Sequence, residues 1–303
     1  MKAPSRLKAI LLAMVVVVIW SSSWILIKIG LRDIPPLTFA GLRYFLGFIF
    51  LTPFLFQKSV REQIRHFSRS DWVLVILMGI FSYYLAQGAQ FLALDHLPAT
   101  TLSLILNLSS ILVTFSAIFL IKEVPTWYQF AGVAINLAGV ILFFYPSGFT
   151  GRSVLGFVFA IVCLLSNSIG TLVGRKLNFQ GRVNPIAVTV VSMGIGSTLM
   201  MFSGLIGHGI PQLSTQSVII VLVLALVNTA FTFVLWNYTL QTLSAMESSI
   251  INGTMLVFIA IFAWIFLGET QDARGVAGLA LAFLGAVIVN IRIARKSKIT
   301  NNA

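Results

Sequence analysis

Residues 94–123, LDHLPATTLSLILNLSSILVTFSAIFLIKE, and residues 240–269, LQTLSAMESSIINGTMLVFIAIFAWIFLGE, follow one pattern at an offset of 146 positions. Each stretch opens with a turn of small residues, continues as an apolar run and ends in a glutamate, Glu123 or Glu269. Two pairs of glycines continue the register, Gly132 with Gly278 and Gly139 with Gly285. Composition alone supplies some of these matches, but it does not account for the paired glutamates. The chain is therefore predicted to consist of two repeats.

The composition around these stretches excludes a water-soluble protein. Of 303 residues, 58% are hydrophobic and 9% are charged, whereas soluble domains carry about 25% charged residues. A helix needs about 20 apolar residues to cross a bilayer, and runs of that length recur along the chain. We predict an all-α, polytopic membrane protein whose partners are the lipid bilayer and a small-molecule solute.

Charge clusters, prolines and glycines divide the chain into ten apolar segments. We expect these segments at 9–30, 36–56, 72–93, 98–121, 126–145, 153–173, 184–206, 216–238, 244–267 and 273–291. The first five-helix repeat is then 9–145 and the second is 153–291, with basic tails at 1–8 and 292–303. The chain start resembles a signal peptide, but no small-residue cleavage site follows, so we expect a retained first span.

The basic residues predict the orientation. If both termini are cytoplasmic, nearly all lysines and arginines in the loops, in the tails and at segment ends lie on the cytoplasmic side, as the positive-inside rule requires. The exceptions are Lys28, Arg32, Arg152 and Arg274. The net charge of +12 is thus interpreted as a topology signal, and nucleic-acid binding is not expected because no basic stripe with interleaved aromatics is present. The expected location is a plasma membrane, such as the bacterial inner membrane.

Five segments per repeat is an odd number, so the second repeat must cross the membrane in the opposite sense to the first. Glu123 then ends its helix inside and Glu269 ends its helix outside. Inverted repeats are a recurrent plan of transporters, since exchanging the conformations of the two halves converts an inward-open shape into an outward-open one. The repeat predicts alternating access through a cavity between the halves.

Several short motifs add a family resemblance. They are WSSSWILIKIGL at 20–31, PPLTFAGLRYFL at 35–46, LDHLPAT at 94–100, IFLIKE at 118–123 and WIFLGE at 264–269. In combination they resemble the EamA-like family of the drug/metabolite transporter superfamily over about residues 9–291. The resemblance implies ten helices, a central cavity and export of small metabolites such as amino acids or related compounds. Family members often carry a proline in the fourth and ninth helices, whereas this chain has Ser110 and Leu256 there, which removes the usual cause of a kink.

Besides Lys28 and Arg274, which lie at segment ends, two charged residues fall within the apolar segments. Arg43 lies about a third of the way along residues 35–54; it either extends to the interface or contacts helix-end carbonyls, or else it faces the cavity and binds a carboxylate. Glu247 lies near the start of the ninth segment. It is the candidate for proton coupling, and the alternative is an interfacial glutamate stabilised by the helix dipole.

Uncharged polar and aromatic residues complete the candidate solute cavity. The polar members are Tyr83, Gln87, Gln90, Asn107, Asn167, Asn228 and Asn252, and the large aromatic members are Trp20 and Trp236. Amides are costly against lipid, so they should point inward. There they either bond neighbouring helices or line a wet cavity, and the aromatic rings either contact a solute or pack.

Other functional classes receive less support from the sequence. A membrane-embedded enzyme would need a nucleophile with its base, a metal-ligand cluster or facing carboxylates, and neither HExxH nor GxSxG occurs. A receptor or scaffold would not need inverted repeats. Cys163 is the only cysteine, so no disulfide, no metal site and no cofactor is expected. Small residues at Gly278, Ala282 and Ala286 allow close helix contact, within the monomer or across a homodimer.

Overall fold

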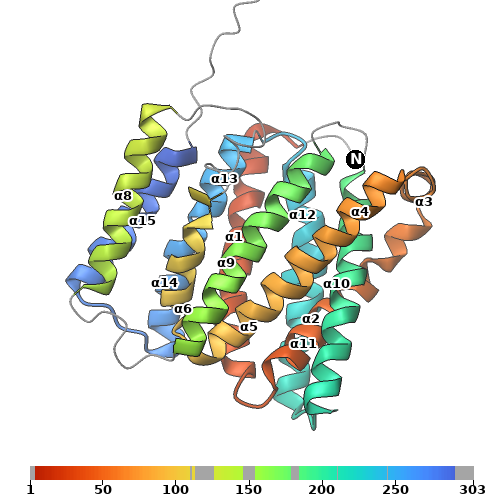
Figure 1. Cartoon of the computed structure of the whole chain (residues 1–303), viewed down its shortest axis with the longest axis horizontal. Coiled ribbons are helices and arrows are strands. Elements are labelled where there is room, and N and C mark those ends of the chain that lie inside the picture. The colour runs from red at the N-terminus through yellow and green to blue at the C-terminus, as the bar shows by residue number, and fades with distance from the viewer. Residues whose placement is uncertain are drawn as a thin grey trace, which may run out of the picture.

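The computed structural model describes residues 4–109, 111–112, 126–145, 154–178, 184–209, 211–243 and 245–290, and all regular structure in these ranges is helical. Figure 1 shows the helices side by side in one bundle. In chain order they are α1 (Arg6–Gly30), α2 (Pro36–Leu51), η1 (Thr52–Phe56), α3 (Lys58–Arg65), α4 (Arg69–Met78), η2 (Gly79–Leu85), α5 (Ala86–His96), α6 (Ala99–Asn107), α8 (Trp127–Phe144), α9 (Val154–Asn178), α10 (Pro185–His208), α11 (Thr215–Ala225), η3 (Leu226–Phe231), α12 (Thr232–Thr239), α13 (Ala245–Gly253), α14 (Met255–Leu267) and α15 (Ala273–Asn290).

Within the described part of the chain, eight helices are long and apolar enough to cross a bilayer. They are Arg6–Gly30, Pro36–Phe56, Arg69–His96, Trp127–Phe144, Val154–Gly174, Pro185–His208, Thr215–Thr239 and Ile250–Leu267. The last predicted segment forms a shorter apolar helix, Ala273–Val289. The fourth predicted segment is described only as far as residue 112, with Ser110 omitted; Glu123 and the tail at 292–303 also lie outside the described residues.

Two ends of the bundle can be defined from α1. We call the end at which α1 begins the near end, and the end at which α1 finishes the far end. At the near end, Arg6 forms an ion pair with Glu247 of α13, with 2.6 Å between Nη2 and Oε1. The Thr242 hydroxyl also donates to the carbonyl oxygen of Pro4 at 2.8 Å. These contacts link the start of α1 to the start of α13.

At the far end, Glu269 links the end of α14 to the start of α6. Its carboxylate accepts hydrogen bonds from the backbone N–H groups of Ala99 at 2.8 Å and Thr100 at 3.0 Å, and from the Thr100 hydroxyl at 2.8 Å. The first N–H groups of a helix have no partner within the helix, and a negative charge there is favoured by the helix dipole. A contact between the two predicted repeats therefore joins α14 to α6 at this end.

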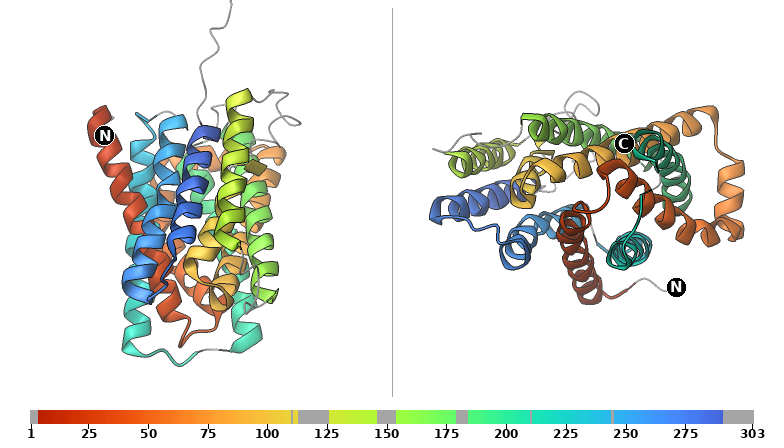
Figure 2. Two further views of the ribbon diagram at one scale, coloured as in Figure 1. Left: turned by 90° about the vertical axis from the view of Figure 1, so that its left-hand side faces the viewer. Right: turned by 90° about the horizontal axis from the view of Figure 1, so that it is seen from below.

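Helices α8 and α15 pair along one edge of the bundle (Figure 1; Figure 2). Their backbones approach so closely that a Cβ atom on Gly139 would lie 2.6 Å from the carbonyl oxygen of Gly278. A Cβ atom on Gly285 would likewise lie 2.6 Å from the carbonyl oxygen of Gly132. Between these contacts, the Asn136 amide donates to the carbonyl oxygen of Ala282 at 2.6 Å. The small-residue face of α15 is thus used within the chain.

Two pairs of irregularities recur at the offset of 146 positions. The π-helical segments are η2, at residues 79–85, and η3, at residues 226–231; the offset places the first at 225–231. The helix breaks lie at Leu108, after α6, and at Thr254, after α13. At both breaks the backbone N–H donates to the carbonyl three residues earlier at 3.1 Å, the bond of a 3₁₀ turn.

The two breaks form without the proline that family resemblance led us to look for. Leu256, the position aligned with the ninth-helix proline, is a buried residue within α14, two residues after the break. The Thr254 hydroxyl donates to the carbonyl oxygen of Ile251 at 2.6 Å, and such local bonds compete with regular helical bonding. The predicted segment 244–267 is therefore interrupted at Thr254, where α13 ends and α14 begins within the span Ile250–Leu267.

The α8–α15 contact makes a stability prediction. Replacing Gly139 with alanine should destabilise the purified protein by about 1–3 kcal/mol, because the added methyl group overpacks two backbones that cannot separate freely. The matched control is Gly207→Ala, since a Cβ atom there meets nothing within 4 Å. Thermal unfolding in detergent should show a lower melting temperature for Gly139→Ala only. Equal melting temperatures for the two variants would contradict the close contact.

Candidate functional site

A group of polar and aromatic side chains lies where the middles of α1, α2, η2–α5 and η3–α12 meet. This central cluster comprises Trp20, Arg43, Tyr44, Tyr83, Gln87, Asn228, Thr229, Thr232, Phe233 and Trp236. Its π-helical segments contribute Tyr83 and Thr229, which align at the offset of 146 positions. Single-turn π segments occur frequently at functional sites, because the extra residue redirects side chains.

Arg43 is the charged member of the central cluster and is only 5% exposed. Its Nε donates to the Thr229 hydroxyl oxygen at 3.2 Å, and its guanidinium carbon lies 4.9 Å from the centroid of the Tyr44 ring. Arg43 therefore does not extend to an interface. Among the described residues, no carboxylate pairs with Arg43 and its two terminal nitrogens have no hydrogen-bond partner. Because burying an unpaired charge is costly, this guanidinium favours an anionic group beside it.

Aromatic rings and amides surround Arg43. The Tyr44 hydroxyl donates to Oε1 of Gln87 at 2.5 Å, and the rings of Tyr44 and Tyr83 pack edge-on with centroids 6.2 Å apart. Elsewhere in the cluster, Nε1 of Trp20 donates to the Thr232 hydroxyl oxygen at 2.8 Å. The Trp20 and Trp236 rings lie 5.3 Å apart. The cluster thus offers one cation, hydroxyl and amide groups, and flat apolar surfaces.

Asn228 fills a structural role within the central cluster. Its side-chain amide donates to the backbone carbonyl of Ile19 at 2.6 Å and to the Ser22 hydroxyl at 3.3 Å. The residue is 2% exposed and belongs to η3. Asn228 therefore attaches the π segment to α1, which is the helix-bonding alternative considered for this set of amides.

The other predicted site residues lie outside the central cluster's contacts. Gln90 is half-buried in α5, one turn beyond Gln87, and Asn167 is half-buried in α9. The Asn107 amide donates to the Ala282 carbonyl oxygen at 3.3 Å, which is again a contact between helices. Asn252 is exposed in α13. Glu247 lies at the near end in its ion pair with Arg6, with a side chain 20% exposed.

Sequence reasoning missed Tyr44, Thr229 and Phe233. These residues do not stand out in the sequence, because a tyrosine, a threonine and a phenylalanine are ordinary in apolar helices, whereas amides and charges are not. A usable signal existed for Thr229, since the offset of 146 positions aligns it with Tyr83. Tyr44 directly follows Arg43, but the sequence alone does not show that its ring covers the guanidinium.

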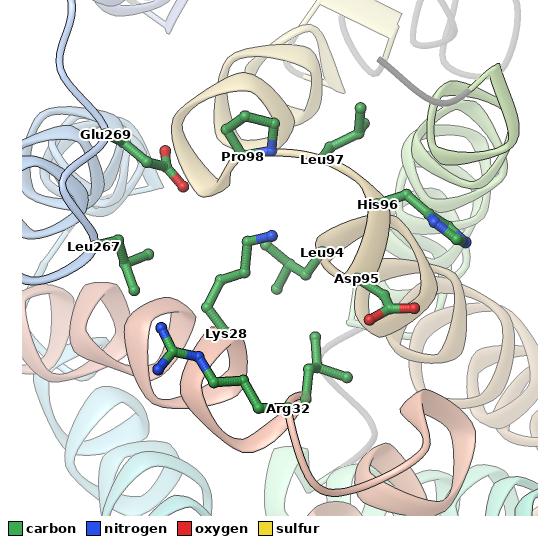
Figure 3. Close-up of a pocket in the computed structure, with 10 residues that line it drawn as sticks. Lys28, Arg32, Leu94, Asp95, His96, Leu97, Pro98, Leu267 and Glu269 are labelled. Atoms are coloured by element: carbon green, nitrogen blue, oxygen red, sulfur yellow. The ribbon is translucent and has the colours of Figure 1, made fainter. Parts of the chain in front are cut away.

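A cavity of about 460 Å³ opens at the far end (Figure 3). We call it the far-end cavity; it is lined by Lys28, Leu31, Arg32, Leu94, Asp95, His96, Leu97, Pro98, Leu267 and Glu269. Lys28 lies near the end of α1, and Figure 3 shows its ammonium group directed into the cavity. Among the described residues no group of three or more metal-ligating side chains occurs.

Comparisons with known proteins identify a family for this sequence. The model of the EamA-like transporter family matches residues 7–145 and again residues 154–291. An uncharacterised transporter of Bacillus subtilis, YoaV, is 27% identical over 288 residues, covering 93% of this chain and 96% of that protein. A Salmonella typhimurium protein named "Probable amino-acid metabolite efflux pump" is 26% identical, covering 95% of this chain and 97% of its own length.

A solved structure has the same fold. It superimposes with a TM-score of 0.68 at 18% sequence identity, covering 94% of this chain and 98% of its own. The two family matches correspond to the two repeats seen in the sequence, and together they span nearly the whole chain. The chain belongs to the EamA-like transporter family.

Proposed function

We propose that this protein is a secondary transporter with ten membrane-spanning segments in two inverted repeats, 9–145 and 153–291, which moves a small solute by alternating access. The observation that carries the proposal is the contact between α8 and α15. Gly132 approaches Gly285 and Gly139 approaches Gly278, so rising numbers on one helix meet falling numbers on the other. Shifting each residue by 146 positions exchanges these two contacts.

Because the repeat offset exchanges these two contacts, it supports a two-fold axis between the antiparallel helices α8 and α15. Such an axis lies in the membrane plane, and it relates halves of opposite orientation. The matching π segments and the matching breaks at Leu108 and Thr254 support the same relation. Broken helices in corresponding positions of two halves are typical of transporter binding sites, where irregular backbone lines a cavity.

The central cluster is the proposed solute site, together with Gln90 on the neighbouring turn of α5. Arg43 would bind a carboxylate of the solute, since a guanidinium can hold two oxygens at once. The tyrosine, tryptophan and glutamine side chains around it would contact the remainder of the solute. This chemistry suits an amino acid or a related metabolite, the class named for the Salmonella relative.

The contacts at the two ends of the bundle are the proposed gates. Glu269 bound to the start of α6 closes the far end, and Arg6 paired with Glu247 connects α1 with α13 at the near end. In an alternating-access cycle these contacts would open in turn. Glu247 is the proposed coupling residue, because releasing it from Arg6 would let its carboxylate take up a proton.

The near end is the proposed cytoplasmic side. The short amphipathic helix α3 carries Lys58, Arg61 and Arg65 there, and Arg69 begins α4 at the same end (Figure 1). Lys28 and Arg32 lie at the far end. Basic loops resist translocation, which supports cytoplasmic termini in a bacterial inner membrane. Export would then run from the near end to the far end.

Substrate-dependent counterflow in proteoliposomes tests the proposed function directly. Purified protein would be reconstituted and loaded with each member of a panel of unlabelled metabolites, including zwitterionic amino acids. The proposal predicts that at least one trapped solute drives uptake of its labelled form. A product formed without flux would instead indicate an enzyme, and an absence of counterflow across the panel for protein shown to be folded would count against a carrier.

The Arg43 assignment predicts a selective loss of solute affinity. Arg43→Gln should raise the KM for a carboxylate solute by about tenfold or more, the effect of losing a charge-assisted hydrogen bond. Arg43→Lys keeps the charge but not the planar guanidinium group, so its KM should lie between those of the unaltered protein and Arg43→Gln. The control is Arg61→Gln, which removes an exposed charge at the near end. An unchanged KM in Arg43→Lys and Arg43→Gln would leave Arg43 a structural residue.

Variants of Glu247 and Arg6 distinguish a role of Glu247 in proton coupling from its role in the near-end ion pair. Glu247→Gln should abolish uphill transport driven by a pH gradient while leaving counterflow, because the titrating group is gone. Arg6→Gln breaks the same ion pair but keeps the carboxylate, so it should retain coupling. Full-rate uphill transport by Glu247→Gln would show that another group carries the proton.

A further inference from the structure

We propose that the far-end cavity is a second binding site, which holds a small anion with a carboxylate or phosphate group and an apolar body. The inference rests on the proposed transport function, because it places this site on the solute's route. The central cluster is a separate site. Lys28 is eight residues beyond Trp20 on α1, or about 12 Å along a helix at about 1.5 Å per residue.

Lys28 provides the positive charge of the far-end cavity. Its side chain is half-buried, and among the described residues it forms no ion pair and no hydrogen bond. Arg32 follows one turn later and also lines the cavity. Figure 3 shows both side chains on the same side of the opening, at the end of α1. A partly desolvated ammonium group without an ion pair gains when an anion binds beside it.

The acidic residues of the cavity do not satisfy Lys28. Both oxygens of Glu269 are engaged by the start of α6 through three hydrogen bonds of 2.8–3.0 Å. Asp95 is exposed and, like Glu269, makes no ion pair within the described residues. Lys28 therefore lies near negative charge without direct contact, which leaves its three donors available to a ligand.

The apolar residues that line the cavity indicate the chemistry of the uncharged part of the ligand. Leu31, Leu94, Leu97, Pro98 and Leu267 contribute apolar surface to the cavity. At about 460 Å³, the cavity is within the range of about 300–1,000 Å³ typical of small-molecule sites, and its apolar walls stand beside charged groups. An anion with a ring or a short aliphatic chain matches this combination better than a bare inorganic ion.

The position of the cavity gives the site a role. The ligand would lie beside Glu269 and the start of α6, the contact that must open for solute to pass this end. An anion arriving from the central cluster would thus meet Lys28 next to the closed gate. The site would then bind the anion with different affinities in the closed and open states, and a ligand can shift the populations of two states only if its affinities for them differ.

Fluorine NMR with 4-fluorobenzoate and its neutral analogue 4-fluorobenzamide tests the site in the full-length protein in phosphatidylcholine nanodiscs. The variants are Lys28→Gln, Lys28→Arg and Arg274→Gln. Arg274 is an exposed cation on the first turn of α15, at the same end but outside the cavity. 4-Fluorophenyl phosphate compares phosphate with carboxylate, and nanodiscs containing phosphatidylglycerol test whether a lipid headgroup competes.

The benzoate is expected to bind about tenfold more tightly than the benzamide, as one charge-assisted contact provides. Lys28→Gln should remove this difference, whereas Lys28→Arg and Arg274→Gln should keep it, in both lipid compositions. Equal binding of benzoate and benzamide, an equal loss in Arg274→Gln, or displacement by phosphatidylglycerol would overturn the proposal. Since binding is measured without flux, its failure is distinguishable from an absence of counterflow.

Discussion

Hydrocarbon offers no hydrogen-bond partners, so each backbone N–H and C=O group within a bilayer must be satisfied by the protein. This constraint explains why the described part of the chain is helical and why its irregular segments still hydrogen-bond their backbone groups within the protein. The segments η2 and η3 shift their hydrogen bonds by one residue within continuous spans. The breaks after α6 and α13 replace regular bonds with 3₁₀ turns. Each irregularity keeps the backbone bonded while it redirects side chains.

The same irregularities gather the polar residues into one place. Thr229 of η3 accepts a hydrogen bond from Arg43, and Tyr83 of η2 packs against the neighbouring tyrosine. The two contributions come from corresponding positions in the two repeats, so the central cluster lies where the halves meet. Each end of the bundle is connected separately, by Glu269 at the far end and by the Arg6–Glu247 pair at the near end. A polar centre with separately connected ends fits the proposed alternating access.

Sequence reasoning identified the membrane-spanning character, the repeats and most of the central residues, because these depend on hydropathy and on matches within the chain. It could not identify the π segments, since each is only six or seven residues long and holds too few polar residues to distinguish one helical period from another. Nor could it choose between the alternatives for Arg43, because the answer depends on Thr229, 186 positions away. The far-end cavity combines α1, the turn between α5 and α6, and the end of α14, and no local pattern brings these together. Lys28 is an example, because a lysine near the end of an apolar helix is normally predicted to extend to the membrane interface. Only the residues packed around it show that it lines a cavity.

The account depends on two opposed halves that exchange conformations around the central cluster. The most direct test is a double electron–electron resonance experiment on two labelled pairs in a Cys163→Ser background. One pair, Asp95 and Thr270, spans the far end, and the other, Ser5 and Gln241, spans the near end; all four positions are exposed. The account predicts that when pH or solute lengthens the distance within one pair, the distance within the other shortens. Distances that lengthen together, or that stay at single values under all conditions, would contradict it.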